Sequence, residues 1–315
     1  MADATPFVTL PVAAASGISP ARPAPLVIGG ATFAWGERTY VMGIVNATPD
    51  SFSGDGLLAS DAAGTGTQPT VAQAIVAQAT AMAEAGADLV DIGGESTRPG
   101  HQPVAEAEER RRILEGLAAV HRARPGLPIS VDTRRAAIAE AALAAGAALI
   151  NDIAAVTDPS EALFRVAAEH GVPIVLMHDR VEARYRSVVA EVVADLQRAI
   201  DRALDAGVPW EQCIVDPGIG FGKTAEQNLA LLRELAILRS LGRPILLGVS
   251  RKSTVGRVLD LPASERLEGT LATTALGVAA GVDIIRVHDV RANLRAARMA
   301  DAIVRHAATT TEASS

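Results

Sequence analysis

Residues 145–153 read AGAALINDI, in which an Ala-Gly pair ends a helical stretch, a short apolar run follows, and polar residues close the run. Glycine commonly ends a helix, and a short apolar run bounded by turn signals is typical of a strand that is buried on both faces. The chain therefore contains a candidate unit of helix followed by buried strand. Eight runs fit this pattern: YVMGIVN (40–46), AGADLVDIGGE (85–95), LPISVDT (127–133), AGAALINDI (145–153), HGVPIVLMH (170–178), CIVDPG (213–218), PILLGVS (244–250) and AGVDIIRVHD (280–289).

The segments between these runs are predicted to be helices. Val192, Leu196 and Ile200 fall on one helical face, and Thr224 and Gln227 have the spacing of a capping box. Eight strands alternating with helices favour a closed (β/α)8 TIM barrel of about the typical 250 residues. A doubly wound open sheet is the alternative, because sequence periodicity does not prove closure.

The segments outside the repeats define the expected domain boundaries. Residues 26–40, LVIGGATFAWGERTY, predict a β-hairpin that closes the N-terminal mouth of the barrel. Residues 1–25 lack a basic start, and Pro6, Pro11 and Pro20 interrupt their apolar stretch, so we expect a disordered or loosely docked extension rather than a signal peptide. The barrel is expected over residues 26–308, with a disordered tail at 309–315.

The composition excludes several classes of protein. The chain has 315 residues, of which 49% are hydrophobic and 3% aromatic, so its core must be aliphatic. A formal net charge of −7 argues against binding to nucleic acid or to a membrane surface. Its single cysteine, Cys213, excludes an internal disulfide framework and fits a reducing compartment, so a cytoplasmic location is expected.

Polar residues stand at the carboxyl ends of the predicted strands, where the active sites of barrel enzymes are built. An Asp or Asn at such a position can instead cap the following helix, and that reading is about equally good for Asp91, Thr133 and Asp152. Asp132, Asp216 and Lys252 are the stronger functional candidates. The full set is Asn46, Asp91, Glu95, Thr97, Arg98, Asp132, Asn151, Asp152, His178, Asp216, Ser250, Arg251, Lys252, Arg286 and His288.

The residue types in this set indicate an anion site beside a heterocycle site. Cations such as Lys252 and Arg286 in an acidic protein favour a phosphate or diphosphate. Carboxylates such as Asp132 and Asp216 suit the adjacent N–H groups of a planar nitrogen heterocycle. No spacing typical of a transition-metal cage is present, and GIGFGKT (218–224) lacks the spacing of a phosphate-binding P-loop.

Seven motifs in this order closely resemble the dihydropteroate synthase family over most of residues 26–305. One such motif alone would prove little, but seven in register leave little room for chance. They are VMGIVNATPDSFSGDG (41–56), DIGGESTRPG (91–100), SVDT (130–133), NDI (151–153), DPGIGFGKTAEQN (216–228), GVSRKS (248–253) and RVHDV (286–290).

The resemblance implies a transferase that joins 6-hydroxymethyl-7,8-dihydropterin diphosphate to 4-aminobenzoate, with diphosphate leaving before the amine attacks. It implies catalytic roles for Asp132, Lys252, Arg286 and His288, and a pterin site made by Asp132, Asn151, Met177, Asp216, Lys252 and Arg286. Diphosphate contacts are implied for Asn46, Thr97, Arg98, Arg286 and His288, with Mg²⁺ held by Asn46. The aminobenzoate pocket would comprise Phe52, Thr97, Arg98, Pro99, Phe221 and Ser253.

The chain departs from the family pattern in two loops. Residues 177–185, MHDRVEARY, carry acidic and basic residues where the family usually has Met-His-Met and a glycine, and Ala47 replaces the usual Val before a Gly-Thr-rich insertion at 57–70. The resemblance implies that the first loop forms a lid over the second substrate, and this insertion is expected to alter the behaviour of that lid. The resemblance also implies a homodimer, for which the Ala-rich segment 269–281 could supply a contact.

Three functions from different classes are compatible with these residues. The synthase is favoured by the SRKS run and the Arg286 and His288 pair. A pterin-binding relative without synthase activity, or a methyltetrahydrofolate-dependent methyltransferase, would share the barrel, but a methyl donor has no diphosphate to hold. A barrel hydrolase using Glu95 and Asp132 is the third possibility, and the cationic cluster weighs against it.

Overall fold

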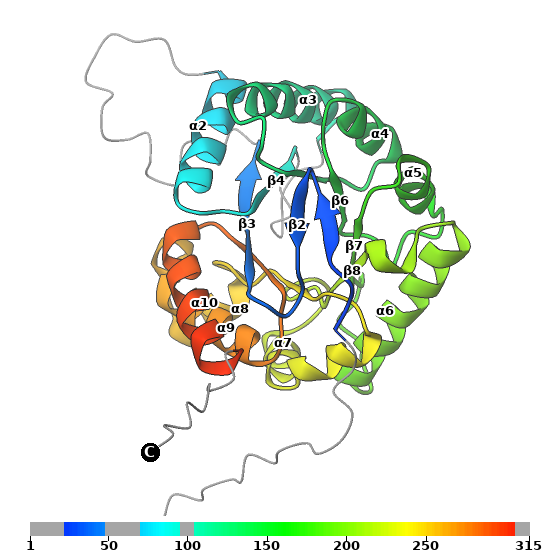
Figure 1. Cartoon of the computed structure of the whole chain (residues 1–315). Coiled ribbons are helices and arrows are strands. Elements are labelled where there is room, and N and C mark those ends of the chain that lie inside the picture. Colours follow the sequence, from blue (N-terminus) through cyan, green and yellow to red (C-terminus); the bar gives the residue numbers. More distant parts are fainter. Residues whose placement is uncertain (1–21, 48–69, 95–103, 306–315) are drawn as a thin grey trace, which may run out of the picture.

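The computed structural model describes residues 22–47, 70–94 and 104–305 (Figure 1). Most of the expected N-terminal extension and all of the expected C-terminal tail lie outside the described residues. All of the Gly-Thr-rich insertion except Thr70, and most of the two loops that follow the first two barrel strands, lie outside them as well. The predicted boundaries at residues 25 and 308 therefore stay predictions.

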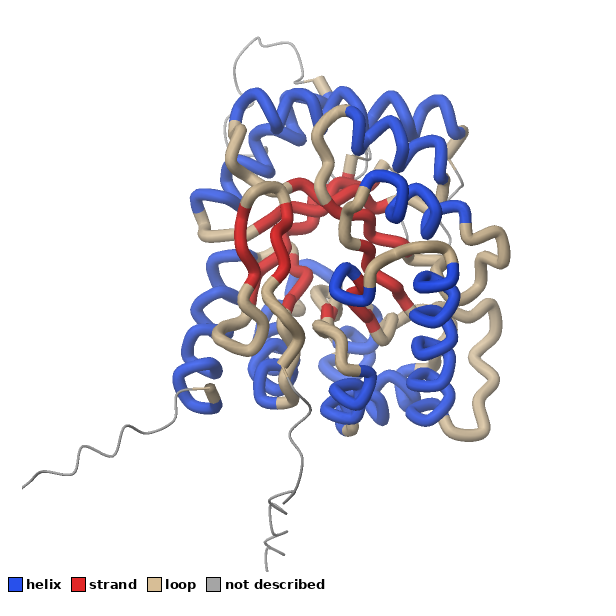
Figure 2. The backbone as a smooth tube through the Cα atoms, turned by 45° about the vertical axis from the view of Figure 1, so that its right-hand side comes forward, coloured by secondary structure: helices blue, strands red, loops and turns tan. Residues whose placement is uncertain are grey.

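Eight parallel strands form the centre of the molecule, which confirms the predicted barrel (Figures 1 and 2). Their order in the sheet is β8-β7-β6-β5-β4-β3-β10-β9. A parallel bridge between Val215 and Ile245 joins β8 to the segment leading into β9 and closes the ring, which excludes the open-sheet alternative. The strands are β3 (Tyr40–Asn46), β4 (Leu89–Gly93), β5 (Ile129–Asp132), β6 (Leu149–Asp152), β7 (Ile174–Met177), β8 (Cys213–Asp216), β9 (Leu246–Leu247) and β10 (Ile284–Val287).

Helices follow the strands along the chain and surround the barrel (Figure 1). Two begin with the reciprocal hydrogen bonds of a capping box, one at Thr70 with Gln73 and the predicted one at Thr224 with Gln227. The α-helices are α2 (Val71–Glu84), α3 (Glu106–Ala123), α4 (Ala136–Ala144), α5 (Ala162–His170), α6 (Val188–Asp205), α7 (Ala225–Arg233), α8 (Ser253–Leu259), α9 (Leu267–Ala279) and α10 (Val290–Val304). Short 3₁₀ helices lie at η1 (Trp210–Gln212), η2 (Leu235–Leu241) and η3 (Ala263–Glu265). None of the described helices is both long enough and apolar enough to cross a bilayer.

The layer between strands and helices is aliphatic, as the composition requires. Val192, Leu196 and Ile200 of α6 are fully buried on the face that packs against the sheet. Burial of apolar surface stabilises a fold by about 25 cal/mol per Å², and interiors of this kind are packed as densely as organic crystals. The helix ring therefore holds the strand ends in fixed positions, which a site built from many strands requires.

A two-stranded antiparallel hairpin, β1 (Leu26–Ile28) and β2 (Ala31–Phe33), closes the N-terminal mouth, as predicted. Its turn consists of Gly29 and Gly30, both with positive φ. Phe33 and Tyr40 lie with ring centroids 4.5 Å apart. They share a buried cluster with one residue from each of seven barrel strands: Met42, Leu89, Leu149, Val175, Ile214, Leu246 and Ile284. Because this cluster fills the barrel interior at the hairpin end, a ligand would enter the barrel interior from the other end.

Replacing Phe33 by Ala tests how much the hairpin contributes. Phe33 is 1% exposed, so its truncation should lower the free energy of unfolding by about 3–5 kcal/mol through lost burial and a residual cavity. Urea denaturation measures the change. Val27→Ala, on the exposed face of the same hairpin, should change it by less than about 0.5 kcal/mol. Equal effects of the two substitutions would contradict the assignment of the hairpin as part of the core.

Candidate active site

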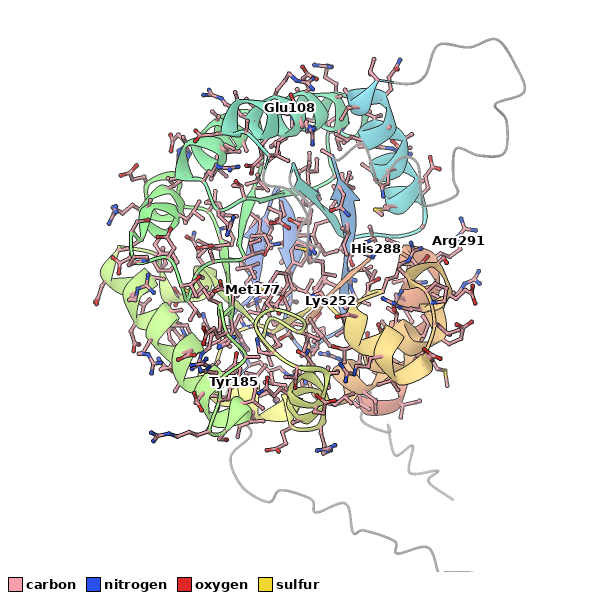
Figure 3. The ribbon with its side chains drawn as sticks, turned by 180° about the vertical axis from the view of Figure 1, so that it is seen from behind. Glu108, Met177, Tyr185, Lys252, His288 and Arg291 are labelled. Atoms are coloured by element: carbon pink, nitrogen blue, oxygen red, sulfur yellow. The ribbon has the colours of Figure 1, made fainter. Side chains whose placement is uncertain are left out.

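The candidate residues meet at the end of the barrel that lies away from the hairpin. Figure 3 looks onto this end, where Met177, Lys252 and His288 lie around the carboxyl ends of the strands. Asp132, Met177 and Asp216 are the last residues of β5, β7 and β8, and Asn151 is the next-to-last residue of β6. The barrel thus brings together residues that are up to 242 positions apart, from Asn46 to His288.

Asp216, Lys252 and Arg286 converge above Gly248. A Cβ atom built on Gly248 would lie 3.8 Å from Lys252 Nζ, 3.9 Å from Asp216 Oδ2 and 3.8 Å from Arg286 Cβ. A side chain at this position would occupy the space between the three groups. The glycine therefore leaves room at the floor of the mouth, and the expected meeting of Asp216 with Lys252 is present.

Asp216 and Lys252 are each held by the loop that follows β8. The Gly218 N–H donates to Asp216 Oδ1 at 2.7 Å, and Lys252 Nζ donates to the Ile219 carbonyl at 2.5 Å. Burial raises the pKa of Asp216, and the nearby Lys252 ammonium opposes that shift. Burial lowers the pKa of Lys252 to about 8, and Asp216 opposes that shift in turn. Each charge makes the other easier to keep in a buried place.

Arg286 lies between two carboxylates from neighbouring strands. Its Nε donates to Asp91 Oδ2 at 2.6 Å, and its Nη2 donates to Asp132 Oδ2 at 2.8 Å. Asn151 Nδ2 also donates to Asp91 Oδ2, at 2.9 Å. Burial, followed by the charge of Asp91, raises the pKa of Asp132, while Arg286 opposes the shift. Asp91 therefore fixes both Arg286 and Asn151, a role that the sequence could not separate from helix capping.

His288 and Arg251 are held by residues that follow β9 and β10. Ser250 Oγ lies 3.0 Å from His288 Nδ1 and accepts a hydrogen bond from the His288 backbone N–H at 3.2 Å. Arg251 donates from Nε and Nη2 to the two oxygens of Asp289, at 3.1 and 2.8 Å. The Arg251 side chain therefore points toward Asp289 after β10, whereas the side chain of the next residue, Lys252, reaches Asp216 at the floor of the mouth.

The remaining predicted residues fall into two groups. Asn46 ends β3 opposite Gly93 of β4, Phe221 lies in the loop after β8, and Ser253 begins α8. The Phe221 ring centroid is 4.7 Å from Lys252 Nζ, so this ring lies beside the group formed by Asp216 and Lys252. Five predicted residues lie outside the described residues: Phe52, Glu95, Thr97, Arg98 and Pro99.

Two residues with no predicted role also lie at this end of the barrel: His178, which belongs to the predicted strand-end set, and the half-buried Lys223, which does not. His178 follows β7 and is fully buried, and Lys223 lies in the loop after β8 with its Nζ 2.9 Å from His178 Nδ1. The sequence predicts His178 at a strand end but indicates no role for it. The segment GIGFGKT was compared only with the phosphate-binding P-loop, whose spacing it lacks. A lysine that follows a glycine-rich loop was the available signal.

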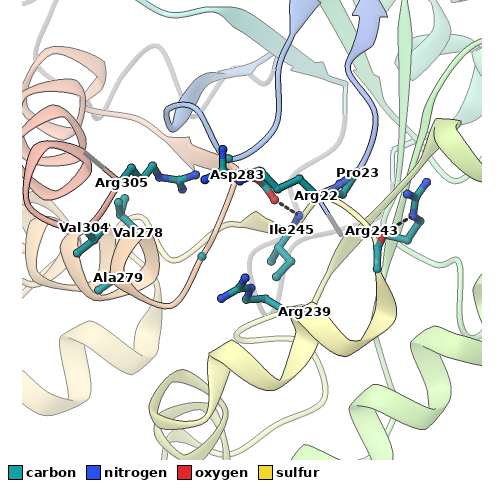
Figure 4. A pocket seen from close by; sticks show the side chains of 13 residues that line it. Arg22, Pro23, Arg239, Arg243, Ile245, Val278, Ala279, Asp283, Val304 and Arg305 are labelled. Carbon is teal, nitrogen blue, oxygen red and sulfur yellow. Dashed lines mark hydrogen bonds between the residues drawn. The ribbon is translucent and has the colours of Figure 1, made fainter. Parts of the chain in front are cut away.

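A separate cavity of about 220 Å³ lies at the opposite end of the molecule (Figure 4). Its lining includes Arg239, Arg305 and Asp283, and Asp283 Oδ2 accepts a hydrogen bond from the Ile245 N–H at 3.0 Å. The lining also includes Pro23, from the segment that leads into the hairpin. None of the predicted site residues lines this cavity, so it is distinct from the candidate active site.

Comparison with known proteins gives consistent matches. The model of the family described as "Pterin binding enzyme" matches residues 42–288. The dihydropteroate synthase of Clostridium beijerinckii is 47% identical over 279 residues, covering 88% of this chain and 99% of that protein. The dihydropteroate synthase of Bacillus subtilis is 48% identical over 269 residues, covering 85% of this chain and 90% of that protein.

Solved structures of the same kind share the fold. The dihydropteroate synthase of Clostridium difficile, determined in the presence of pteroic acid, superposes with a TM-score of 0.78 at 41% identity, covering 87% of this chain and all of that one. The Xanthomonas albilineans dihydropteroate synthase with 4-aminobenzoic acid gives a TM-score of 0.80 at 40% identity, covering 89% of this chain and 98% of that one.

The network around Arg286 predicts a stability effect of Asp91. Asp91→Ala removes a fully buried carboxylate and leaves Arg286 with one of its two partners, so the free energy of unfolding should fall by about 3 kcal/mol in urea denaturation. Adding Arg286→Met removes the charge that lost its partner, so the double variant should be more stable than Asp91→Ala alone. A single variant as stable as the wild type would contradict the role given to Asp91.

Proposed function

This chain belongs to the dihydropteroate synthase family of pterin binding enzymes, and we propose that its barrel mouth joins 6-hydroxymethyl-7,8-dihydropterin diphosphate to 4-aminobenzoate, giving 7,8-dihydropteroate and diphosphate. The reaction is a transferase step of folate biosynthesis. The observation that carries the proposal is the convergence of Asp216, Lys252 and Arg286 at one glycine. This pairing of a buried carboxylate with two cations suits a substrate that has an amino-pyrimidinone edge and an anionic tail.

The pterin is proposed to lie at the floor of the mouth. Asp216 is 4% exposed, and its carboxylate can accept two parallel N–H bonds from the amino-pyrimidinone edge. Met177 stands opposite Asp216 in the register of β7 and β8 and is buried, so it offers an apolar contact to the ring. Asn151, Asp132 and Lys252 are proposed to reach the other polar atoms of the ring.

The cations at the mouth are proposed to stabilise the departing diphosphate. When the bond between the pterin methylene carbon and the diphosphate oxygen breaks, the electron pair goes to diphosphate and positive charge develops on the pterin. Arg286, which donates to Asp132, and His288, which contacts Ser250, are proposed to bind the negative product, and the Asp132 carboxylate is proposed to stabilise the pterin cation. Preorganised charges of this kind need no reorganisation as the bond breaks.

Mg²⁺ is proposed to bind the diphosphate with Asn46 as its protein ligand. Asn46 is the last residue of β3, its side chain is partly exposed, and an amide oxygen is the hard donor that Mg²⁺ prefers. A bound Mg²⁺ would neutralise diphosphate charge, and substrate oxygens and water would supply its other ligands. Asn46 would hold the ion at the carboxyl end of β3.

The second substrate is proposed to enter beside Phe221 and Ser253. The Phe221 ring already lies against the Lys252 ammonium, so an aromatic amine stacked near it would stand next to the pterin methylene. Phe52, Thr97, Arg98 and Pro99 are proposed to complete the pocket. An aromatic amine is a modest nucleophile, so holding it in line with the methylene carbon supplies much of the rate.

A second copy of the chain is the proposed partner. Leu276 of α9 and Met299 and Ile303 of α10 are 69, 64 and 68% exposed, and α9 and α10 pack against each other. Apolar side chains grouped on adjacent helices are typical of a subunit interface. Sedimentation velocity should give the mass of a dimer, and Met299→Asp with Ile303→Asp should give a monomer. A wild-type monomer at micromolar concentration would contradict this proposal.

The cytoplasm is the proposed location. Cys213, the single cysteine of the chain, is a buried free thiol, and thiols persist in reducing compartments. Burial raises the pKa of this thiol to about 11, so it is an unreactive residue of the core. Fractionation of the source cells, with detection of the chain in the soluble cytoplasmic fraction, tests the location.

A diphosphate-release assay tests the proposed reaction. The wild type should release diphosphate and form dihydropteroate only when pterin diphosphate, 4-aminobenzoate and Mg²⁺ are all present. Lys252→Ala should lower kcat/KM at least about 100-fold, because the ammonium is lost from a buried site, while the circular dichroism spectrum is retained. Release from pterin diphosphate alone, without condensed product, would instead favour a pterin-binding relative that lacks synthase activity.

The pH dependence of kcat/KM follows from the shifted pKa values of Asp132 and Lys252. Asp132 must be ionised and its pKa is raised, so activity should fall on the acid side at a pH above the ordinary aspartate range. Lys252 must be protonated and its pKa is about 8, so activity should fall as the pH rises through about 8. A profile that stays flat from pH 5 to pH 10 would rule out these protonation states.

A further inference from the structure

The loop that carries Phe221 has little backbone rigidity of its own. We call residues 217–224, which follow β8, the glycine loop. Gly218, Gly220 and Gly222 have φ of 64, 86 and 57°. Glycines at positive φ give a loop the most freedom to lose on folding, so the loop needs fixed contacts to hold a single shape. The position of the Phe221 ring therefore depends on those contacts.

Lys223 supplies such contacts by folding back under its own loop. Its Nζ donates to the carbonyl oxygens of Gly218 at 2.9 Å and of Phe221 at 3.0 Å, and lies 2.9 Å from His178 Nδ1. Nζ also lies 3.4 Å from the His178 carbonyl oxygen, so its N–H donors are surrounded by four acceptors. Lys223 thus joins both ends of the glycine loop to the loop that follows β7.

His178 is held in the form that can accept this bond. Its Nε2 lies 3.0 Å from Asp195 Oδ2 of α6, and a carboxylate only accepts, so Nε2 carries the proton and Nδ1 presents its lone pair to Lys223. Asp195 is held in turn by Arg180, whose Nη2 donates to the same oxygen at 2.8 Å. A continuous chain of hydrogen bonds therefore runs from α6 to the glycine loop.

The two loops also touch through their backbones. A Cβ atom on Gly218 would overlap the His178 carbonyl, and one on Gly222 would overlap the Arg180 carbonyl. Tyr185 Oη donates to the Gly222 carbonyl at 3.0 Å. Arg180 and Tyr185 belong to segment 177–185, the one whose charged residues depart from the family pattern. These residues therefore brace the glycine loop.

The glycine loop carries one of the proposed substrate-binding residues, and the others belong to strands or to another loop. Phe221 lies on the loop itself, whereas Asp216 and Arg286 are anchored on β8 and β10. Lys252 is held at the loop through the Ile219 carbonyl but also faces Asp216. The loop also contacts Asp216, whose Oδ1 accepts from the Gly218 N–H at 2.7 Å. A displacement of the glycine loop would therefore move the Phe221 ring directly, and would affect Asp216 less because the strand holds its backbone.

We propose that Lys223 is a positioning residue for 4-aminobenzoate, acting through the bonds that fix the glycine loop and hence the Phe221 ring. This inference rests on the proposed function, because it assigns the second substrate to the Phe221 side of the mouth. Lys223 touches neither substrate in this account. Its effect reaches the reaction through the shape of one pocket wall.

Lys223→Met tests the inference by removing the ammonium and keeping the apolar stem. The KM for 4-aminobenzoate, measured at saturating pterin diphosphate and Mg²⁺, should rise at least about tenfold. The Kd of 6-hydroxymethyl-7,8-dihydropterin diphosphate, measured by titration calorimetry with Mg²⁺, should stay within about threefold of the wild type. A merely structural role for Lys223 would not separate these two quantities.

Two further variants keep the result interpretable. Arg257→Met removes an exposed cation from the neighbouring helix α8, and it should change neither KM nor Kd. Lys223→Gln keeps two amide donors without the charge, and it replaces Lys223→Met if that variant does not fold, with a smaller expected rise in KM. An unchanged KM in a folded Lys223 variant, or a Kd that worsens as much as KM, would overturn the inference. Failure of the wild type to require 4-aminobenzoate would instead overturn the proposed function.

Discussion

The arrangement of the site depends on one guanidinium group held between two carboxylates. Arg286 spans from Asp91 on β4 to Asp132 on β5, and this contact is possible only because the closed sheet brings β10 around to β3. Each of these charges would be costly to bury alone. Together the guanidinium and the two carboxylates offset much of one another's burial cost, which fixes Arg286 at the floor of the mouth.

The same constraint explains why the rest of the mouth has both signs of charge. Asp216 and Lys252 stabilise each other against burial, and His288 is held by Ser250 at the rim. The carboxylates suit the N–H edge of a heterocycle, while the cations Lys252 and Arg286 beside them suit an anionic group such as a diphosphate. The aliphatic core and the hairpin at the other end hold these charged side chains in fixed positions. The charges can therefore stabilise the reaction without the side chains having to rearrange.

The sequence predicts the scaffold well because its signals are local. Ala-Gly stops, apolar runs and the Thr224 capping box each act within a few residues, and closure follows from eight such units. It also predicts Asp216, Lys252 and Arg286, because each stands at or shortly after the carboxyl end of a predicted strand. It does not predict that Asp91 orients Arg286, or that Lys223 reaches His178, because those bonds join segments 195 and 45 positions apart. Such pairings depend on how two loops or strands pack together, so the two residues have no characteristic separation in the sequence.

The most direct test of the central claim is a crystal structure of the chain soaked with 6-hydroxymethyl-7,8-dihydropterin diphosphate and Mg²⁺. The account predicts the pterin ring within hydrogen-bond distance of the Asp216 carboxylate, with its diphosphate beside Arg286 and His288 and the ion at Asn46. Density for the ligand elsewhere, such as in the arginine-lined cavity beside Asp283, with the Asp216 carboxylate uncontacted, would contradict it.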